Sequence, residues 1–104
     1  MDPYENLRRG IAEKDTTIGW VYFARGLKTR LVKIGWTKND AQKRIKDLQI
    51  GSPDILELIA MIRGTKAMEL HLHDRFAEQR SHGEWFSESV LIVLEERRDV
   101  CLVI

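Results

Sequence analysis

The sequence has almost no cysteine and no long hydrophobic run. Cys101 is the only cysteine among the 104 residues, which excludes an intrachain disulfide and suits a reducing compartment, so we expect a cytoplasmic protein. No apolar segment approaches the roughly 20 residues that span a bilayer, and we expect no membrane partner. Residues 1–10 carry charges from the start and contain no apolar segment, which argues against a secretory signal.

An excess of charge of either sign is also missing. The chain has 17 lysines and arginines and 16 aspartates and glutamates, so net charge alone does not predict nucleic-acid binding, and any basic surface must come from local clustering. With 43% hydrophobic and 32% charged residues, the composition is that of a globular protein, and the length suits one domain. We expect residues 1–18 to form an arm or short helix, and residues 19–104 to form a single domain ending in a helix and a tail.

Two alternating segments, residues 19–24 and 31–36, stand out in the first half of the chain. Period-two alternation on both sides of a short segment that contains Gly26 predicts a β-hairpin. Tyr22 and Lys33 fall on the face away from the core, where we expect them to be cross-strand neighbours with Cβ atoms roughly 5 Å apart. A phenol beside an ammonium on that face is a candidate functional pair.

The rest of the chain predicts three helices, one more strand and an apolar tail. A helix capped by Thr37 or Asn39 ends at Gly51, because glycine favours helix C-caps and Pro53 cannot continue the helix. Residues 55–62 are apolar almost throughout and form a strand buried on both faces. Helices over residues 66–80 and 87–98 follow, and residues 100–104 either add an edge strand or pack on the core. We therefore predict an α/β (α+β) fold with a three-stranded, mainly antiparallel sheet flanked by helices, in the order β-β-α-β-α-α.

Several short motifs, in this order, resemble the GIY-YIG nuclease superfamily. Val21-Tyr22 stands where the family has its first Ile-Tyr, with Trp20 in place of the usual glycine. Lys33-Ile34-Gly35 stands where the family has Tyr-Ile-Gly, with lysine in place of tyrosine. Arg44 follows at the spacing of the family's helix arginine, and Glu69 matches its metal-binding glutamate.

The resemblance covers most of the chain, from Gly19 to Phe86. Its second half, which includes His73-Asp74-Arg75-Phe76, is similar to a small bacterial and phage branch whose second motif is Lys-Ile-Gly. The resemblance implies a GIY-YIG-like catalytic domain, a metal-dependent endonuclease that hydrolyses DNA phosphodiester bonds with one Mg²⁺ or Mn²⁺ ion. Such chemistry needs a group that activates water, a cation on the scissile phosphate and positive charge on the transition state.

The resemblance also divides the catalytic roles among several residues. Glu69 is the implied metal ligand, and Arg44 holds a phosphate oxygen through its planar guanidinium. Tyr22 and Lys33 are both open as the group that activates water, and we expect the Lys33 charge to lower the pKa of the Tyr22 phenol. Three roles are open for His73: orienting Glu69, contacting the phosphate or assisting the leaving group.

Glu84 has two interpretations. The family usually has an asparagine near the end of its core, and no asparagine follows Asn39, so Glu84 either substitutes in the catalytic site or merely caps a helix. The missing asparagine, together with Trp20, supports an alternative function: a catalytically inactive module of the same fold that binds nucleic acid or protein. In that case Glu69 and His73 form only an ordinary helix-surface pair.

DNA contacts are expected from cations that crowd the hairpin turn and the first helix: Lys28, Arg30, Lys38, Lys43 and Lys46. Such contacts hold phosphates without reading sequence, and they weaken steeply with salt. We therefore expect a DNA partner of low sequence specificity, single-stranded or structured. Alternatively, the partner is a second copy of the chain, in a homodimer, or an accessory protein.

Overall fold

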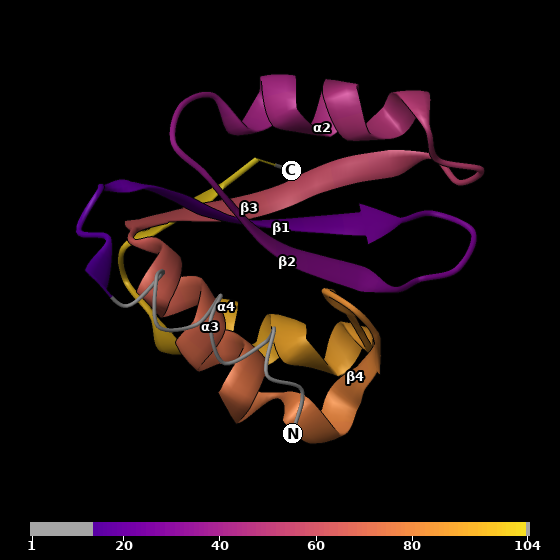
Figure 1. The fold of residues 1–104 in the computed structure, drawn as a ribbon. Helices are drawn as coiled ribbons and strands as arrows, with labels where there is room; N and C mark the ends of the chain where they lie inside the picture. Colours follow the sequence, from indigo (N-terminus) through magenta and orange to yellow (C-terminus); the bar gives the residue numbers. More distant parts are fainter. Residues whose placement is uncertain (1–13, 104) are drawn as a thin grey trace.

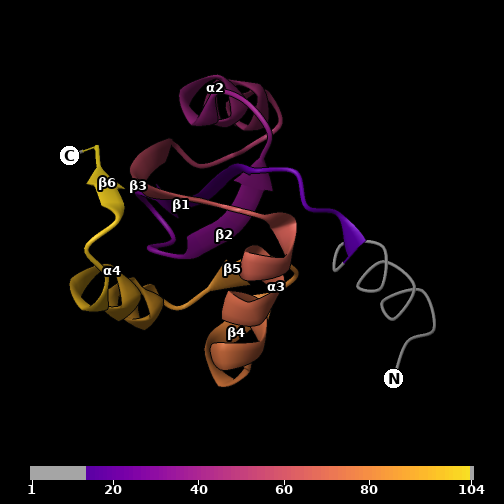
Figure 2. The same cartoon turned by 90° about the vertical axis from the view of Figure 1, so that its left-hand side faces the viewer.

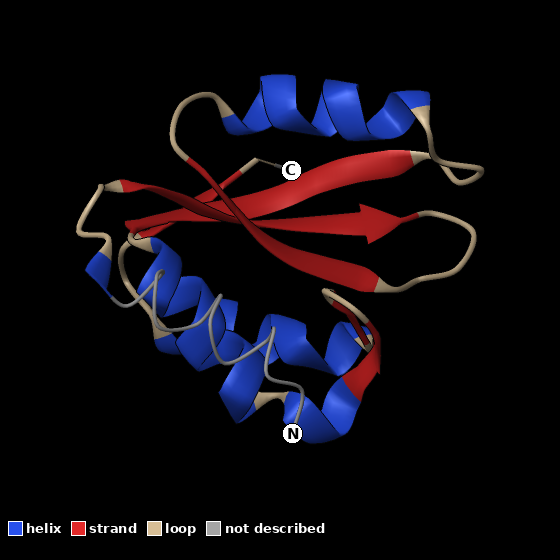
Figure 3. Cartoon of the chain, in the orientation of Figure 1, coloured by secondary structure: helices blue, strands red, loops and turns tan. Residues whose placement is uncertain are grey.

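The computed structural model describes residues 14–103, and in this part of the chain six antiparallel strands form one sheet with helices on both faces (Figure 1). The strands are β1 (Gly19–Gly26), β2 (Val32–Thr37), β3 (Leu56–Gly64), β4 (Arg80–His82), β5 (Trp85–Phe86) and β6 (Val100–Leu102), in the spatial order β4-β5-β2-β1-β3-β6. The helices are α2 (Ala41–Ile50), α3 (Lys66–Arg75) and α4 (Val93–Glu96), with 3₁₀ turns η1 (Ala77–Gln79) and η2 (Glu88–Ile92). Helix α2 covers one face of the sheet, and α3 and α4 cover the other (Figure 3).

The predicted three-stranded sheet in the order β-β-α-β-α-α is wrong. The three predicted strands are present as β1, β2 and β3, but β4, β5 and β6 extend the sheet at both edges. These additions are two or three residues long. Alternation is a usable signal only over about 4–8 residues, so strands of this length leave no periodic pattern. The apolar tail supplies one of them: β6 pairs with β3, with Cys101 opposite Met61, as an edge strand (Figure 2).

The β1–β2 hairpin is confirmed, but its register differs from the prediction. Tyr22 lies opposite Gly35, and Lys33 lies opposite Ala24, so Tyr22 and Lys33 are diagonal neighbours rather than a direct pair. The turn sets this register: Gly26 N donates to Leu31 O at 3.0 Å, and the backbone inside the turn reverses with a φ of 63° at Arg30. Alternation fixes which residues share a face and does not fix how far one strand slides along the other.

The face that carries Tyr22 is a second core and not a solvent-facing surface. Tyr22 is only 1% exposed and packs in a cluster with Ala24, Ala41, Ile45, Leu56 and Leu58 beneath α2. Asp40 caps this helix, because its Oδ1 accepts from Gln42 N at 2.9 Å and Lys43 N at 3.3 Å, in place of the predicted caps Thr37 and Asn39. Gly51 is the C-cap, as predicted.

The two later helices are shorter than predicted. Helix α3 begins after the cap Thr65 and ends at Arg75, because η1 and β4 occupy the residues expected to continue it. The segment predicted as one helix over 87–98 divides into η2, capped by Ser87, and the short α4. Within residues 14–103, none of the helices has the length and apolar character needed to cross a membrane. Most of the predicted arm, residues 1–13, lies outside the described residues.

Candidate active site

Tyr22 lies at the centre of the candidate site, with its ring across Gly35. The two residues are cross-strand partners on β1 and β2, and a Cβ at position 35 would meet the Cζ and Oη atoms of Tyr22. Glycine therefore leaves the space that the phenol occupies. The packing of Tyr22 explains why the Lys33-Ile34-Gly35 motif ends in glycine.

The environment of Tyr22 raises the pKa of its phenol. Burial is the largest cause, and the negative charges of Glu84 and Glu69 add to it. The Arg44 guanidinium acts in the opposite direction, by a hydrogen bond to the phenol and by its charge. The prediction that Lys33 lowers this pKa is therefore wrong: the pKa rises, and the cation that opposes the rise is Arg44. Residues from α2, α3 and the β4–β5 turn therefore all act on the pKa of one phenol.

Lys33 is held by Glu84. Its Nζ lies 2.6 Å from Glu84 Oε2, and the two side chains are 12% and 29% exposed. Glu84 occupies the turn between β4 and β5, and its backbone carbonyl accepts a hydrogen bond from Ile34 N at 3.1 Å. The alternative in which Glu84 merely caps a helix is wrong, because Ser87 is the N-cap of η2. Glu84 instead holds the Lys33 ammonium on the Tyr22 face of the sheet.

Glu69 and His73 lie one turn apart on α3 and are 1% and 2% exposed. His73 Nε2 lies 2.8 Å from the Ile34 carbonyl oxygen, which can only accept, so Nε2 carries the proton. Nε2 also lies 3.6 Å from Glu69 Oε1, and Nδ1 lies 3.5 Å from an Arg80 guanidinium nitrogen, which donates to it. Phe86 supports the ring edge-on at 5.0 Å. The pair is therefore buried against β2 and is not an ordinary helix-surface pair.

The cations predicted to bind DNA are all exposed, but they do not form one cluster. Lys28 and Arg30 lie in the β1–β2 turn, whereas Lys38 follows β2 at the other end of the hairpin, where Trp20 pairs with Thr37. Arg30 pairs with Glu88 at 3.2 Å. The remaining two, Lys43 and Lys46, lie on α2 with Arg44. The predicted cations therefore lie at both ends of the hairpin and along α2, and their contact with DNA stays a prediction.

The donor set of the site has one carboxylate suited to a metal. Among the described residues, no group of three or more His, Cys, Asp or Glu side chains is arranged to hold an ion. Glu69 offers hard oxygen donors of the type that Mg²⁺ and Mn²⁺ prefer. Mg²⁺ keeps several waters and binds through one or two carboxylates together with substrate phosphates. A single cation shared between Glu69 and a bound phosphate therefore fits the residues present.

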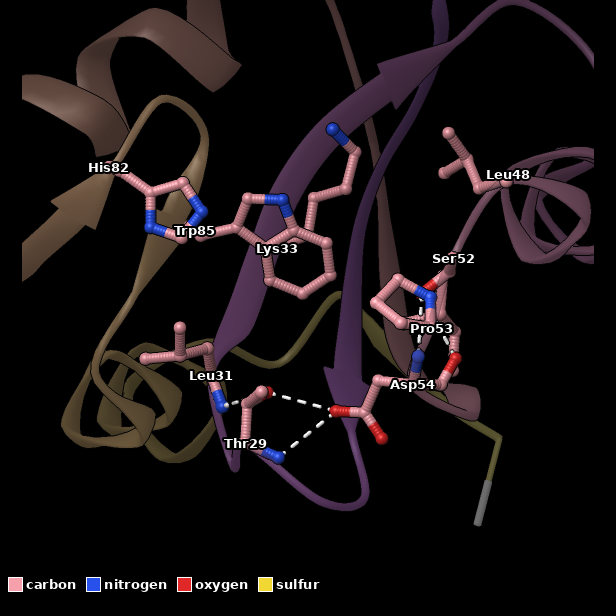
Figure 4. Close-up of a pocket in the computed structure, with 11 residues that line it drawn as sticks. Thr29, Leu31, Lys33, Leu48, Ser52, Pro53, Asp54, His82 and Trp85 are labelled. Carbon is pink, nitrogen blue, oxygen red and sulfur yellow. Dashed lines mark hydrogen bonds between the residues drawn. The ribbon is translucent and has the colours of Figure 1, made fainter.

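A cavity of about 400 Å³ lies next to Lys33. Trp85 and His82 line one side of it, and Ser52 and Pro53 line the other (Figure 4). Sequence reasoning did not find this cavity. The Ser-Pro-Asp triplet at 52–54 is a turn signal, but its position against the β1–β2 turn depends on tertiary packing.

The sequence matches the T5orf172 domain over residues 19–101, from the start of β1 to the second residue of β6. This domain occurs in phage and bacterial proteins, some of them nuclease-related. No curated protein and no solved structure matches the chain. The matched range contains every candidate catalytic and metal-binding residue described above. The chain therefore belongs to the T5orf172 domain family.

Proposed function

We propose that this domain is a metal-dependent DNA endonuclease related to the GIY-YIG superfamily, which hydrolyses phosphodiester bonds. The observation that carries the proposal is that α2, which bears Arg44, packs over Tyr22 on β1, and that Arg44 and Glu69 both act on the charge of its phenol. Burying a phenol and a carboxylate is unfavourable for folding unless they are compensated, and a purely structural core would contain apolar residues instead. Membership of a family with nuclease-related members supports the same function.

Arg44 binds the scissile phosphate in this mechanism. Its side chain is exposed on α2 and reaches the phenol of Tyr22, so one end of the guanidinium is held by the protein while the rest faces solvent. A planar guanidinium can donate two parallel hydrogen bonds to phosphate oxygens. Charge placed there stabilises the additional negative charge of the transition state.

Glu69 holds the cation, and the buried His73 ring lies beside Glu69. A bound Mg²⁺ supplies Lewis-acid stabilisation of the phosphate that is being attacked. The His73 ring is fixed by the Ile34 carbonyl and by Phe86, and its Nε2 lies 3.6 Å from Glu69 Oε1. Of the three roles that the sequence leaves open for His73, the geometry supports orienting Glu69, because a ring 2% exposed and tied to the backbone is poorly placed to reach a leaving group.

Tyr22 and the Lys33–Glu84 pair act on the attacking water. Because burial raises the pKa of Tyr22, the phenol stays protonated at neutral pH and positions water through its oxygen instead of removing a proton. The proton that water loses is accepted by the Glu84 carboxylate, either directly or through the Lys33 ammonium, which lies 2.6 Å away and passes one proton on as it takes another. As the water oxygen bonds to phosphorus, the P–O bond to the leaving strand breaks, and the leaving oxygen takes a proton from solvent.

A second candidate function is a module of the same fold that binds nucleic acid or protein without cleaving it. The observation that favours it is burial: Tyr22 and Glu69 are each 1% exposed, so neither side chain is open to a substrate in this structure. The inactive module predicts DNA binding that falls with salt and no cleavage with any divalent cation.

The two functions are separated by incubating the protein with single- and double-stranded oligonucleotides and Mg²⁺ or Mn²⁺, and following product formation on gels. We expect cleavage by the natural sequence, a fall of about 100-fold or more in Tyr22→Phe, and a loss of about 100- to 1,000-fold in Arg44→Ala. Glu69→Gln removes the metal-binding charge and is expected to abolish cleavage.

Matched controls remove the same kinds of group elsewhere. Glu95→Gln removes an exposed carboxylate from α4, and Arg97→Ala removes an exposed guanidinium outside the site. Both are expected to cleave at the normal rate. Cleavage that persists in Tyr22→Phe and in Glu69→Gln rejects the site, and a natural sequence that binds DNA but never cleaves it identifies the inactive module.

A further inference from the structure

The cavity beside Lys33 is open to a ligand and is built from three segments. It lies between the β1–β2 turn, the loop that follows α2, and the β4–β5 strands (Figure 4). Its volume of about 400 Å³ falls within the range of small-molecule sites. Lys33 belongs both to this cavity and to the candidate active site, so the two are joined through one side chain.

We propose that this cavity receives one unpaired DNA base next to the scissile phosphate. The proposal rests on the function proposed above and deepens it, because it names single-stranded or locally unpaired DNA as the substrate class. The cavity is of a size for a single base or nucleotide and has room for no stacked pair.

The lining of the cavity has the chemistry of a base-stacking site. The Trp85 indole is half-buried and lies beside the Lys33 ammonium, whose Nζ is 5.9 Å from the ring centroid. Leu48 and Pro53 lie across from it, and Leu31 lies at the end near the hairpin turn (Figure 4). Bases stack on aromatic side chains in single-stranded nucleic-acid sites, and aliphatic walls cover the rest of the ring.

The charges of the cavity orient the nucleotide. Lys33 places an ammonium, held by Glu84, at one end of the cavity, whereas Asp54 places a carboxylate beside the hairpin turn. This carboxylate is fixed, because it accepts from Lys28 N at 2.9 Å and from Thr29 N and Oγ1 at 3.0 Å. A fixed negative charge repels a phosphate, so the base and not the phosphate enters the part of the cavity near Asp54.

The walls are held in place before any ligand binds. Gln49 Nε2 donates to the Asp54 carbonyl at 2.8 Å, and Gln49 Oε1 accepts from Leu56 N at 2.7 Å, which joins α2 to the loop that follows it. A preformed site loses little entropy on binding. A base in a duplex must be extruded before it can enter such a site, whereas an unpaired base needs no extrusion. The cavity therefore favours single strands over duplexes.

The test measures binding and excludes cleavage, by fluorescence anisotropy of labelled single-stranded and duplex DNA of one sequence in EDTA. We expect Trp85→Ala to weaken single-strand binding by about 5- to 100-fold, the range for loss of one base–aromatic stack. Duplex binding is expected to change by less than about twofold. Trp85→Phe retains an aromatic face and is expected to restore most of the affinity. Trp20→Ala is the matched control, since this half-buried tryptophan also stacks with a cation, Arg63 at 5.0 Å, but lies outside the cavity.

A second variant fills the cavity without removing Trp85. Gly51 lines the cavity, has a φ of −99° that any residue adopts, and has nothing within 4 Å of an added Cβ. Gly51→Trp is therefore expected to fold and to lose single-strand affinity as Trp85→Ala does. Unchanged single-strand affinity in both variants, or equal losses for duplex and single strand, overturns the proposal. Cleavage is assayed separately with Mg²⁺, so the two proposals fail in different ways. If the protein cleaves DNA but both variants keep their single-strand affinity, only the base site is rejected. If both variants lose single-strand affinity but the natural sequence does not cleave, only the nuclease is rejected.

Discussion

The two faces of the sheet use the same strands for different purposes. The α3–α4 face holds a hydrophobic cluster of twelve buried residues within residues 14–103, with the buried Glu69 and His73 of α3 beside it. The α2 face holds a smaller cluster of six, with Tyr22 at its centre and Trp85 and Met61 packed against it from the rim. Along β1 the faces alternate residue by residue, so Phe23 belongs to the first and Tyr22 to the second.

Along β1 the difference between the faces separates stability from catalysis, whereas α3 contributes Glu69 and His73 to the candidate site from the other face. The larger apolar cluster supplies most of the hydrophobic stabilisation, which grows with buried apolar area. The smaller one leaves room at its edge for groups that are unfavourable to bury, such as the Lys33–Glu84 pair. We therefore expect substitutions on the two faces of one strand to have opposite signatures, stability on one face and activity on the other.

The largest expected difference is between Phe23→Ala and Tyr22→Phe. Phe23 is 0% exposed, so its truncation leaves a cavity and lowers the free energy of unfolding by about 3–5 kcal/mol. Tyr22→Phe keeps the ring and returns the exposed Arg44 to water, so we expect a loss of about 1 kcal/mol or less. Urea unfolding followed by circular dichroism measures both. Equal losses of stability would show that the two faces are one core.

A smaller difference in stability is expected between alanine substitutions at two glycines. In Gly35→Ala the new Cβ meets the Tyr22 ring, so the ring must move, and we expect a loss of about 1–3 kcal/mol in unfolding free energy together with most of the cleavage activity. In Gly51→Ala the new Cβ meets nothing within 4 Å and the backbone is unstrained, so we expect a gain of up to about 1 kcal/mol. Thermal melts and cleavage rates measure both. A Gly35→Ala protein with normal cleavage would show that the position of Tyr22 does not matter.

Periodicity makes much of this fold predictable, because each of the long elements has a face to bury. The strands β1, β2 and β3 and the helix α2 follow from alternation, an apolar run and a glycine C-cap. Two features of the fold could not be predicted from the sequence. Edge strands such as β5, with two residues, are stabilised by pairing with β2 and leave no pattern of their own. Hairpin register depends on hydrogen bonds within the turn, which alternation does not encode.

The candidate site was predictable as a set of residues and not as a set of contacts. Tyr22, Arg44 and Glu69 were readable from the order of motifs, and in the structure both Arg44 and Glu69 act on the pKa of the Tyr22 phenol; their catalytic roles stay a prediction. The partner of Lys33 was not readable, because Glu84 lies 51 positions away and joins the site only through the β4–β5 turn. The predicted direction of the Tyr22 pKa shift was also wrong, because the shift depends on burial under α2 and a sequence motif does not show which side chains are buried.

The smallest expected difference concerns how stability depends on pH through the Asp54 carboxylate, which lies in the loop between α2 and β3. Backbone hydrogen bonds from Thr29 and Lys28 lower the pKa of Asp54 below its ordinary value of 3.8. A lowered pKa means that the ionised group stabilises the fold at and above neutral pH, and that this stabilisation disappears as pH falls below about 4 toward the folded-state pKa. We expect the urea midpoints of Asp54→Asn and the natural sequence to differ at pH 7 and to converge at low pH. Asp47→Asn, which removes one exposed carboxylate from α2, is the control for loss of a negative charge. A difference that is constant from pH 7 to pH 2.5 would show that the Asp54 carboxylate does not hold the hairpin turn, and with it that wall of the cavity, through its charge.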